Sequence, residues 1–255
     1  IRDSFFTLPE DGRIYRDWKE GGHGNTNLFK AITQSSNTYF FDLAYRSDIN
    51  KLNAHLSSLG FGDKACIDCF EEDRVFVPNP SWKMNKHNFG WCKGVTVNMG
   101  VGQGYLVSTP IQLAKYAYII ANKGKYSDLS LKKDLVKNEM NIQFNTFSND
   151  DWYKLHESMV NVIEGNTGTA RRLKETKSYV VAAKTGTAEL VSADSKDQYV
   201  ETRLDDSLRD HALIIAFGPI PNPRYAISVV VENGESGGSV AGPVAISVLN
   251  SLIQE

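Results

Sequence analysis

The sequence predicts a single α+β domain spanning residues 1–255, because helical and strand patterns occupy different parts of the chain. Apolar residues at helical spacing dominate residues 27–163, whereas three β-rich runs and one helix fill residues 179–253. At 255 residues, with 41% hydrophobic and 23% charged residues, the chain can bury a sizeable core.

Helix-start signals place the segment Ser35-Ser36-Asn37 at a junction between two helices. Asn27 can cap the first helix, and a second is expected to begin near Thr38. Side chains at such a junction can point into a cleft.

Three further helices are expected. Apolar residues spaced by three and four predict one over 49–59, ending at Gly60. Thr109 and Gln112 form a capping box that starts a helix reaching about residue 122. Residues 148–163 repeat this logic with one apolar face.

The last third is β-rich, with expected strands over 179–190, 211–218 and 225–232, followed by a helix over 240–253. Consecutive strands with short connections favour antiparallel pairing. The long polar connection over 191–210 is expected to be either functional or disordered.

Charge and hydropathy exclude several classes of protein. A net charge of −2 gives no electrostatic case for nucleic acid or an anionic membrane as a partner. The longest apolar runs, such as 212–217, are too short to span a bilayer, and no signal peptide opens the chain. Any membrane anchor is therefore expected outside it.

The three cysteines are too few for a disulfide framework. Cys66-Ile-Asp-Cys69 has redox or zinc-ligand spacing, but a second cysteine pair and a Cys-His cluster are absent from the sequence. We interpret these cysteines as incidental thiols or a minor local bridge.

The most informative segment is Lys184-Thr-Gly-Thr-Ala-Glu189, at the end of an apolar run. A lysine, two hydroxyls and a glycine on a strand edge can hold a carboxylate and a carbonyl oxygen. A Ser-x-Asn element, here Ser35-Ser36-Asn37, accompanies Lys-Thr-Gly in serine acyl-transfer enzymes.

Together with 98–105, 109–114 and Gly168-Thr-Ala170, these segments resemble the transpeptidase domain of class B penicillin-binding proteins. Residues 15–24 and 209–211 look most like the penicillin-binding protein 2 branch, which serves cell elongation. The resemblance runs from about residue 9 to about residue 250. It implies the penicillin-binding protein/serine β-lactamase-like fold, an antiparallel sheet of about five strands flanked by helices.

The resemblance also implies that part of the domain is missing. The family's nucleophilic serine lies in a Ser-x-x-Lys motif several tens of residues before Ser-x-Asn, but only 34 residues precede Ser35. The nucleophile, with the N-terminal part, is therefore expected outside this chain, and the chain alone is expected to be inactive. The match Ser130-Leu-Lys-Lys133 comes after Ser-x-Asn, in a polar stretch that we interpret as a solvated loop.

By resemblance, the catalytic residues are Ser35, Asn37 and Lys184, and the substrate-binding residues are Thr185, Gly186 and Thr187. Ser35 belongs to the proton relay, and Asn37 orients the substrate amide and the absent lysine. Lys184 supplies positive charge, while both threonine hydroxyls bind the substrate carboxylate. The N–H of Thr187 is half of the oxyanion hole. Gly186 lets the substrate backbone lie against the strand edge.

Two sets of residues in the resemblance segments also have a purely structural interpretation. Ser35 and Asn37 can be helix-capping residues, the commonest use of such residue types. The glycines at 100, 102 and 104 do not have dinucleotide-binding spacing and are expected to shape a loop behind the active site.

The implied chemistry requires no cofactor, but a zinc site is an open alternative. Asp17 and His23, with Asp3, can form one, since carboxylate and imidazole are ordinary zinc ligands. Some relatives look able to hold zinc here with a cysteine as a further ligand. This chain has Ser36 in that place.

The resemblance implies a peptidoglycan D,D-transpeptidase that acts on D-Ala-D-Ala stem peptides and is inhibited by β-lactams. Its implied partners are the elongation machinery, including a glycosyltransferase, and its implied location is the periplasmic side of the inner membrane. A serine β-lactamase and a noncatalytic wall-peptide-binding or scaffold domain remain as alternatives.

Overall fold

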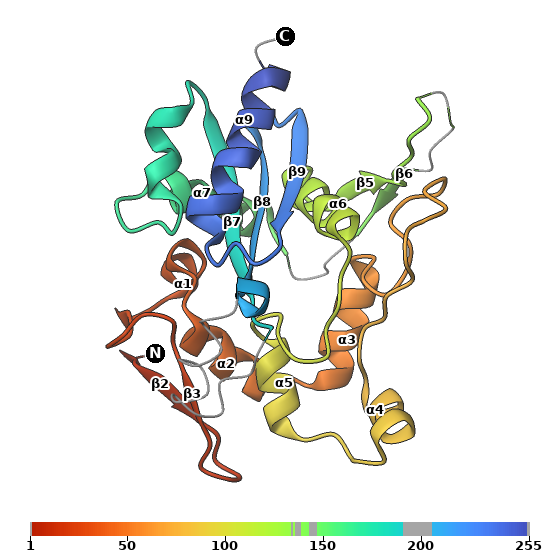
Figure 1. Cartoon of the computed structure of the whole chain (residues 1–255), viewed down its shortest axis with the longest axis vertical. Coiled ribbons are helices and arrows are strands. Elements are labelled where there is room, and N and C mark those ends of the chain that lie inside the picture. The colour runs from red at the N-terminus through yellow and green to blue at the C-terminus, as the bar shows by residue number, and fades with distance from the viewer. Residues whose placement is uncertain (1, 134, 136–138, 143–146, 191–205, 254–255) are drawn as a thin grey trace. The chain divides into compact units, whose positions relative to one another are not determined.

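A computed structural model describes residues 2–133, 135, 139–142, 147–190 and 206–253 (Figure 1). The chain divides into two compact units. The first consists of Ile1–Gln112 and Lys125–Phe144, and the second of Leu113–Gly124 and Asn145–Glu255. Each unit is described separately below.

The second unit is built on an antiparallel sheet with strand order β7-β8-β9. Its strands are β7 (Val180–Ala188), β8 (His211–Ile220) and β9 (Tyr225–Val231), which confirms the three expected strands. These are three of the about five strands that the resemblance implies for the complete sheet. Of the connection over 191–210, residues 191–205 lie outside the described part, and Asp206–Leu208 form a short 3-10 turn.

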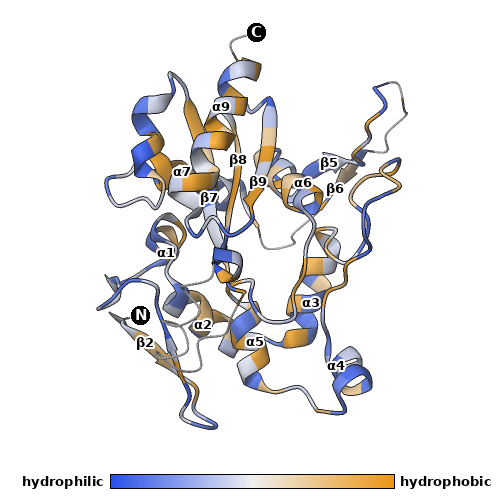
Figure 2. Cartoon of the chain, in the orientation of Figure 1, coloured by the Kyte–Doolittle hydropathy of each residue, from blue (hydrophilic) through white to orange (hydrophobic). Residues whose placement is uncertain are grey.

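Two helices share a hydrophobic core with this sheet, α7 (Asn149–Glu164) and α9 (Gly242–Ile253). Apolar residues run along both the strands and these helices (Figure 2). The fully buried contributors are Val162, Ile163, Val181, Ala183, Ala212, Ala216, Ala241, Ala245 and Leu249. Burial of this apolar surface is the main force that holds β7 in place.

Helix caps confirm the predicted boundaries in this part of the chain. Helix α6 (Pro110–Ala121) starts at the expected capping box, in which the Gln112 backbone N–H donates to the Thr109 hydroxyl and the Thr109 N–H donates to the Gln112 amide oxygen. Helix α7 starts with a second box between Ser148 and Asp151. A short helical turn, η1 (Arg171–Thr176), leads from α7 toward β7.

In its described residues, the first unit combines short β-pairs with five complete helices. The paired strands are β1 (Arg2–Asp3) with β4 (Gly24–Asn25), β2 (Phe5–Thr7) with β3 (Ile14–Arg16), and β5 (Lys125–Ser127) with β6 (Glu139–Asn141). The helices are α1 (Leu28–Gln34), α2 (Asn37–Arg46), α3 (Ile49–Ser58), α4 (Pro80–His87) and α5 (Lys93–Met99). Leu8, Phe41 and Val97 form a buried cluster that joins the β2–β3 hairpin to α2 and α5.

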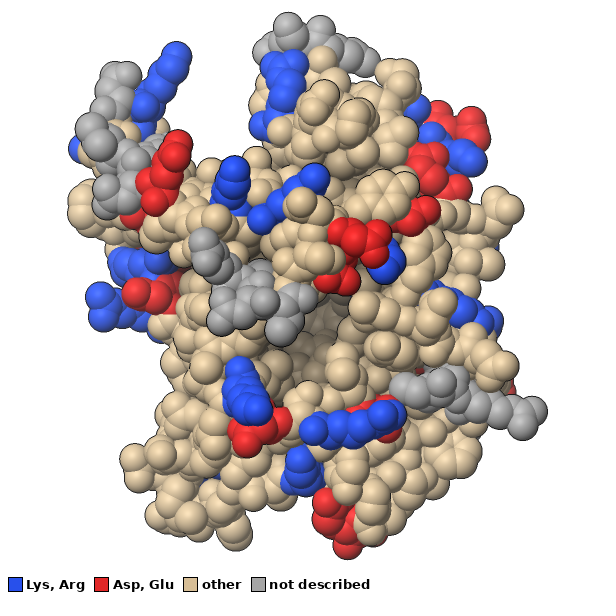
Figure 3. Space-filling model, turned by 180° about the vertical axis from the view of Figure 1, so that it is seen from behind, with Lys and Arg blue, Asp and Glu red and all other residues tan. Residues whose placement is uncertain are grey.

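The described residues show the distribution of charge and the character of the helices. Acidic and basic side chains are interspersed on the face shown in Figure 3, without an extended patch of one sign there. Within the described ranges, no helix combines the length and the apolar character that crossing a bilayer requires.

Candidate active site

The Lys184-Thr185-Gly186-Thr187 segment lies in the second half of β7. Lys184 pairs with Ile215 and Gly186 with Leu213 of β8. Among the described strands, β8 is the sole ladder partner of β7, so the opposite edge of β7 has no strand against it in that part of the chain. An extended peptide can add to such an edge through main-chain hydrogen bonds.

Within this segment, Lys184 has the most strongly shifted pKa. The residue is half-buried, and its ammonium group donates to the backbone oxygen of Thr185 at 2.8 Å. Desolvation by burial lowers the pKa of Lys184 from 10.5 to about 8. The side chain is therefore mainly charged at neutral pH but can lose its proton more easily than an ordinary lysine.

The Thr185 hydroxyl is held by a residue outside the strand. It lies 2.7 Å from the hydroxyl of Thr169, just before η1. The neighbouring Gly168 packs so closely on α7 that a Cβ there would lie 2.2 Å from the Val162 carbonyl oxygen. The Gly168-Thr-Ala170 segment therefore contacts the Lys-Thr-Gly strand directly, through the hydrogen bond between the Thr169 and Thr185 hydroxyls.

A second glycine, located between β9 and α9, packs against β7. Gly237 begins a π-helical turn, η3 (Gly237–Ala241), that leads into α9. A Cβ at Gly237 would lie 2.2 Å from the backbone oxygen of Leu213 and 2.6 Å from that of Gly186. Sequence reasoning missed this residue, and its only signal was the Gly-Gly pair before the last helix.

The Thr187 hydroxyl is also bonded to this region. It donates to the backbone oxygen of Glu235 at 3.4 Å, while the residue itself stays exposed. Glu235 has a positive φ of 59° and donates its own N–H to the Asp210 carbonyl. The turn after β9 therefore lies beside the end of the Lys-Thr-Gly strand.

The Ser35-Ser36-Asn37 segment forms the predicted junction between α1 and α2. Ser35 ends α1 in the left-handed region, with φ 57° and ψ 49°. Ser36, rather than Ser35 or Asn37, provides the capping side chain, because its hydroxyl accepts the backbone N–H of Tyr39 at 3.3 Å. Asn37 is the first residue of α2, one position earlier than expected.

A glycine lets α5 approach α2 one turn beyond Asn37. A Cβ at Gly100 would lie 2.4 Å from the Cβ of Ala44 and 2.8 Å from the Phe40 backbone oxygen. Gly102 and Gly104 follow with positive φ values of 81° and 78°. In the first unit, Gly102 and Gly104 shape the loop that follows α5. That this loop lies behind the active site remains a prediction.

The candidate zinc residues form a hydrogen-bonded cluster. His23 Nε2 lies 3.0 Å from Asp17 Oδ1, and His23 Nδ1 lies 2.8 Å from Gln34 Oε1. The other Asp17 oxygen accepts the Ser36 hydroxyl at 3.3 Å and the Thr38 N–H at 3.1 Å. The Asp3 side chain lies outside the described part of the structure.

The described donors, Asp17, His23 and Ser36, do not fit a zinc site. Both ring nitrogens of His23 and both oxygens of Asp17 already have protein partners. The neighbouring hydroxyl of Ser36 is a much weaker zinc ligand than the thiolate, imidazole and carboxylate groups that zinc prefers. No step of the chemistry below is therefore assigned to a metal.

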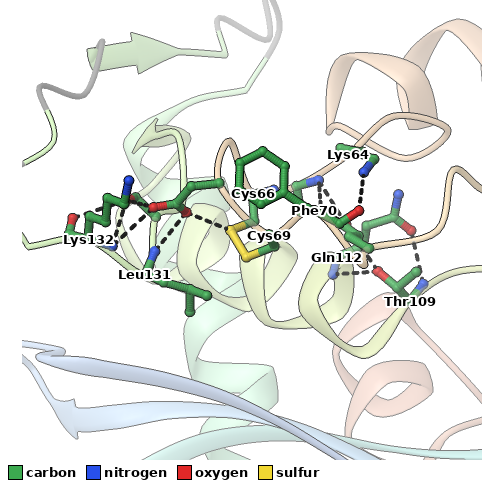
Figure 4. Close-up of a disulfide and its surroundings, with 12 residues drawn as sticks. Lys64, Cys66, Cys69, Phe70, Thr109, Gln112, Leu131 and Lys132 are labelled. Carbon is green, nitrogen blue, oxygen red and sulfur yellow. Dashed lines mark hydrogen bonds between the residues drawn. A yellow bond between two sulfur atoms is a disulfide. The ribbon is translucent and has the colours of Figure 1, made fainter.

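Cys66 and Cys69 form a disulfide (Figure 4). Of the two interpretations of these cysteines, the local bridge is therefore the one that the structure contains. With Asp68 the two cysteines are the one group of three or more histidine, cysteine or acidic side chains close enough to share a metal ion within the described residues. A disulfide offers no thiolate, so this cluster does not fit a zinc site either.

The loop containing Ser130 is exposed over residues 131–133, as expected for a solvated loop. Ser130 itself is half-buried, and its hydroxyl donates to Asp68 Oδ2 at 2.8 Å. The Leu131 and Lys132 backbone N–H groups also donate to this carboxylate (Figure 4). With Leu131 as the largest contributor, these bonds lower the pKa of Asp68. Ser130 thus ties its loop to the disulfide.

The predicted site residues therefore fall into two groups. Lys184, Thr185, Gly186 and Thr187 lie together on β7 in the second unit. Ser35 and Asn37 lie together at the α1–α2 junction in the first unit. That the two groups act on one substrate remains a prediction.

Known proteins with similar sequences are peptidoglycan transpeptidases. The peptidoglycan D,D-transpeptidase MrdA of Acinetobacter baumannii is 39% identical over 246 residues, which cover 93% of this chain and 36% of the relative. The protein of the same name from Haemophilus influenzae is 34% identical, covering 98% of this chain and 40% of the relative. The chain thus spans well under half the length of these relatives.

Solved structures agree with these sequence matches. Pseudomonas aeruginosa PBP2 in complex with WCK 5153 has a TM-score of 0.88 at 35% identity, covering 100% of this chain and 56% of that one. PBP2 from Helicobacter pylori, solved in complex with MreC, has a TM-score of 0.84 at 32% identity, covering 96% of this chain and 43% of that one.

The family model described as the penicillin binding protein transpeptidase domain matches residues 2–250, nearly the whole chain. It extends over both compact units and includes the Ser-x-Asn and Lys-Thr-Gly segments. The chain therefore belongs to the penicillin-binding protein transpeptidase family.

Proposed function

We propose that this chain is part of a peptidoglycan D,D-transpeptidase of the penicillin-binding protein 2 type. The observation that carries the proposal is the construction of β7. A partly desolvated Lys184 and the anchored hydroxyl of Thr185 lie next to Gly186, in a strand with one edge that pairs with no other described strand. Such an edge suits a peptide that ends in a carboxylate, as D-Ala-D-Ala does.

The proposed reaction uses a serine supplied by a segment outside this chain. Its oxygen attacks the carbonyl of the penultimate D-alanine, the bond to the terminal D-alanine breaks, and the serine proton passes to the leaving amine. An amine of a second stem peptide then attacks the ester, which forms the cross-link and returns the serine. A β-lactam enters the first step but leaves a slowly resolved ester.

Each group in this chain has a proposed role in that reaction. Ser35 passes the proton between the nucleophile and the leaving group, and Asn37 orients the substrate amide. Lys184 provides positive charge near the substrate carboxylate, and the Thr185 and Thr187 hydroxyls bind it. The N–H of Thr187 stabilises the developing oxyanion. These roles require the two units to be parts of one domain, which the match of the family model across both supports.

The proposed partners are those of cell elongation. A PBP2 relative at 32% identity was solved with MreC, which supports an elongation partner for the complete protein that contains this chain. We extend the proposal to a glycosyltransferase partner and to a position at the inner membrane with this domain in the periplasm. The anchor would lie outside the described residues.

The proposal is tested on the complete protein with a fluorescent penicillin and with nitrocefin, a chromogenic cephalosporin. A transpeptidase forms one long-lived acyl adduct per chain, detected by intact mass, and hydrolyses nitrocefin slowly. Sustained fast hydrolysis would instead identify a β-lactamase. Absence of any adduct, together with absence of an upstream Ser-x-x-Lys motif, would favour a noncatalytic binding domain.

A further inference from the structure

A buried pair of polar side chains contacts the Ser35-Ser36-Asn37 segment from outside its two helices. The side chains of Asp17 and His23 are 0% and 1% exposed, and His23 Nε2 lies 3.0 Å from Asp17 Oδ1. A carboxylate so far from water is stable only when its oxygens are well hydrogen-bonded. The hydrogen-bond partners of Asp17 therefore identify the segment that this pair stabilises.

Asp17 is bonded to both sides of Asn37. Its Oδ2 accepts the Ser36 hydroxyl at 3.3 Å and the Thr38 backbone N–H at 3.1 Å. Ser36 and Thr38 are themselves 0% and 2% exposed, so water does not compete for these bonds. The carboxylate thus anchors the first turn of α2, on which Asn37 lies.

The neighbours of Asp17 hold the residue before that turn. The Trp18 indole N–H donates to the Ser35 backbone oxygen at 2.9 Å and to that of Gln34 at 3.3 Å. His23 Nδ1 contacts the Gln34 side chain at 2.8 Å. These bonds stabilise Ser35 in the left-handed region, where a residue with a Cβ pays a conformational cost.

We propose that the Asp17–His23 pair, aided by Trp18, positions Ser35 and Asn37 through direct hydrogen bonds and without a metal ion. The bonds to Ser36 and Thr38 occupy the carboxylate oxygen that faces α2, and the ring of His23 links Asp17 back to the end of α1. Asp17 and His23 are thus positioning residues. This inference rests on the proposed function for its kinetic test only.

The kinetic test compares Asp17→Ala and Asp17→Asn in the complete protein. Asp17→Ala removes every bond of the carboxylate, and misplacement of the site should slow acylation by penicillin by about 10-fold to 100-fold. Asparagine keeps an acceptor oxygen for the Ser36 hydroxyl and the Thr38 N–H, and its amide can contact His23. It loses only the acceptor of the exposed Lys19 N–H, which donates to Asp17 Oδ1 at 3.2 Å, so Asp17→Asn should stay within about threefold of the original rate.

Asp48→Ala is the matched control. Asp48 is also an aspartate at a helix start in the first unit, where it accepts the N–H groups of Asn50 and Lys51. Its loss should lower the melting temperature without changing the acylation rate. If Asp17→Ala behaves in the same way when measured well below its melting temperature, the pair is merely structural and the inference is wrong.

Metal dependence is tested on the same proteins. Treatment with dipicolinate should leave the acylation rate unchanged, and the purified protein should contain far less than one zinc per chain. A rate that falls with the chelator and returns with added zinc, or an Asp17→Asn variant as slow as Asp17→Ala, would overturn the metal-free positioning.

Hydrogen exchange of the segment 36–40 gives a readout that does not depend on activity. Asp17→Asn should keep the Thr38 amide protected. Trp18→Phe, which removes the indole donor, should raise exchange at this segment about 10-fold and slow acylation. Asp17→Ala should raise exchange further if it folds. Unchanged exchange in both Trp18→Phe and Asp17→Ala would refute the inference, even if the complete protein proved unable to react with penicillin.

Discussion

Replacing Lys184 with methionine should make the protein more stable and much less reactive toward β-lactams. The pKa of Lys184 falls from 10.5 to about 8 because burial desolvates its charged form. At about 1.4 kcal/mol per pKa unit, this desolvation costs roughly 3 kcal/mol of folding free energy. Methionine has a similar volume and no charge. Because the lysine is half-buried, solvent screening should leave a measured gain of about 1 to 3 kcal/mol.

The stability gain should depend on pH in a defined direction. Below about pH 8, Lys184 is charged in both the folded and the unfolded states, and the full cost is present. Between about 8 and 10.5 the folded protein has lost this proton while the unfolded chain keeps it, so stability rises with pH. The advantage of Lys184→Met should therefore shrink across this window and vanish above it.

The same substitution should slow acylation. It removes the charge that we propose contacts the carboxylate of the β-lactam, a contact worth about 2 to 4 kcal/mol of transition-state stabilisation, or roughly 30-fold to 1000-fold in rate. The rate is measured with fluorescent penicillin on the complete protein at pH 7. The free energy of unfolding is measured by urea denaturation at several pH values on the same samples.

Lys174→Met is the matched control, because Lys174 is an exposed lysine of η1 in the same unit. It should change neither the stability nor the acylation rate. A Lys184→Met variant that is less stable but acylates normally would show that Lys184 has a structural role alone. A stability difference that does not change with pH would refute the desolvation argument.

Three other predictions concern the chain alone and the supports of β7. The 255-residue chain alone should form no stoichiometric penicillin adduct by intact mass, and an adduct at Ser130 would overturn the assignment of the nucleophile to another segment. Gly237→Ala should cost about 1 to 3 kcal/mol in urea denaturation and slow acylation, because a Cβ would lie 2.6 Å from the Gly186 backbone oxygen. Thr169→Val should slow acylation about 3-fold to 10-fold, because the Thr185 hydroxyl loses its partner at 2.7 Å.

Two substitutions of the same kind serve as controls for the supports. A Cβ at Gly90 would approach only the Met84 side chain, at 4.0 Å, so Gly90→Ala should be close to neutral. Thr176→Val removes a hydroxyl that donates to the Leu173 backbone oxygen in η1, away from β7. Equal effects in test and control variants would show that neither support acts through the site.

The sequence was a good guide to the elements whose signals are local. Capping at Asn27, Thr109 and Ser148 predicted the starts of three helices, because each signal is a bond between residues three positions apart. The strands over 180–188 and 211–220 followed from their apolar composition. The short pairs of β1 to β4 were missed because two or three residues carry too little pattern.

The site was predictable in its motif residues but not in its supports. Lys184 and Asn37 belong to recognisable segments, whereas the contacts of Asp17 with Ser36 and Thr38 join positions 19 and 21 residues apart. Such bonds depend on the path of the whole β3–α2 segment. Asp17 stood out in the sequence as a possible metal ligand, because an aspartate near a histidine is typical of a metal site. Its hydrogen bond to His23 is visible only in the structure.

The two motif segments share one physical feature, which explains why their supports matter. Each contains a residue in an unfavourable state, the left-handed backbone of Ser35 and the desolvated charge of Lys184. Neither state persists unless surrounding contacts outweigh its cost, which is of order 1–3 kcal/mol for such a backbone conformation. Substitutions that relieve the cost, such as Lys184→Met, should therefore stabilise the fold and reduce activity. Substitutions that remove a support, such as Trp18→Phe, should reduce activity without that gain, and this difference in sign separates the two kinds of residue experimentally.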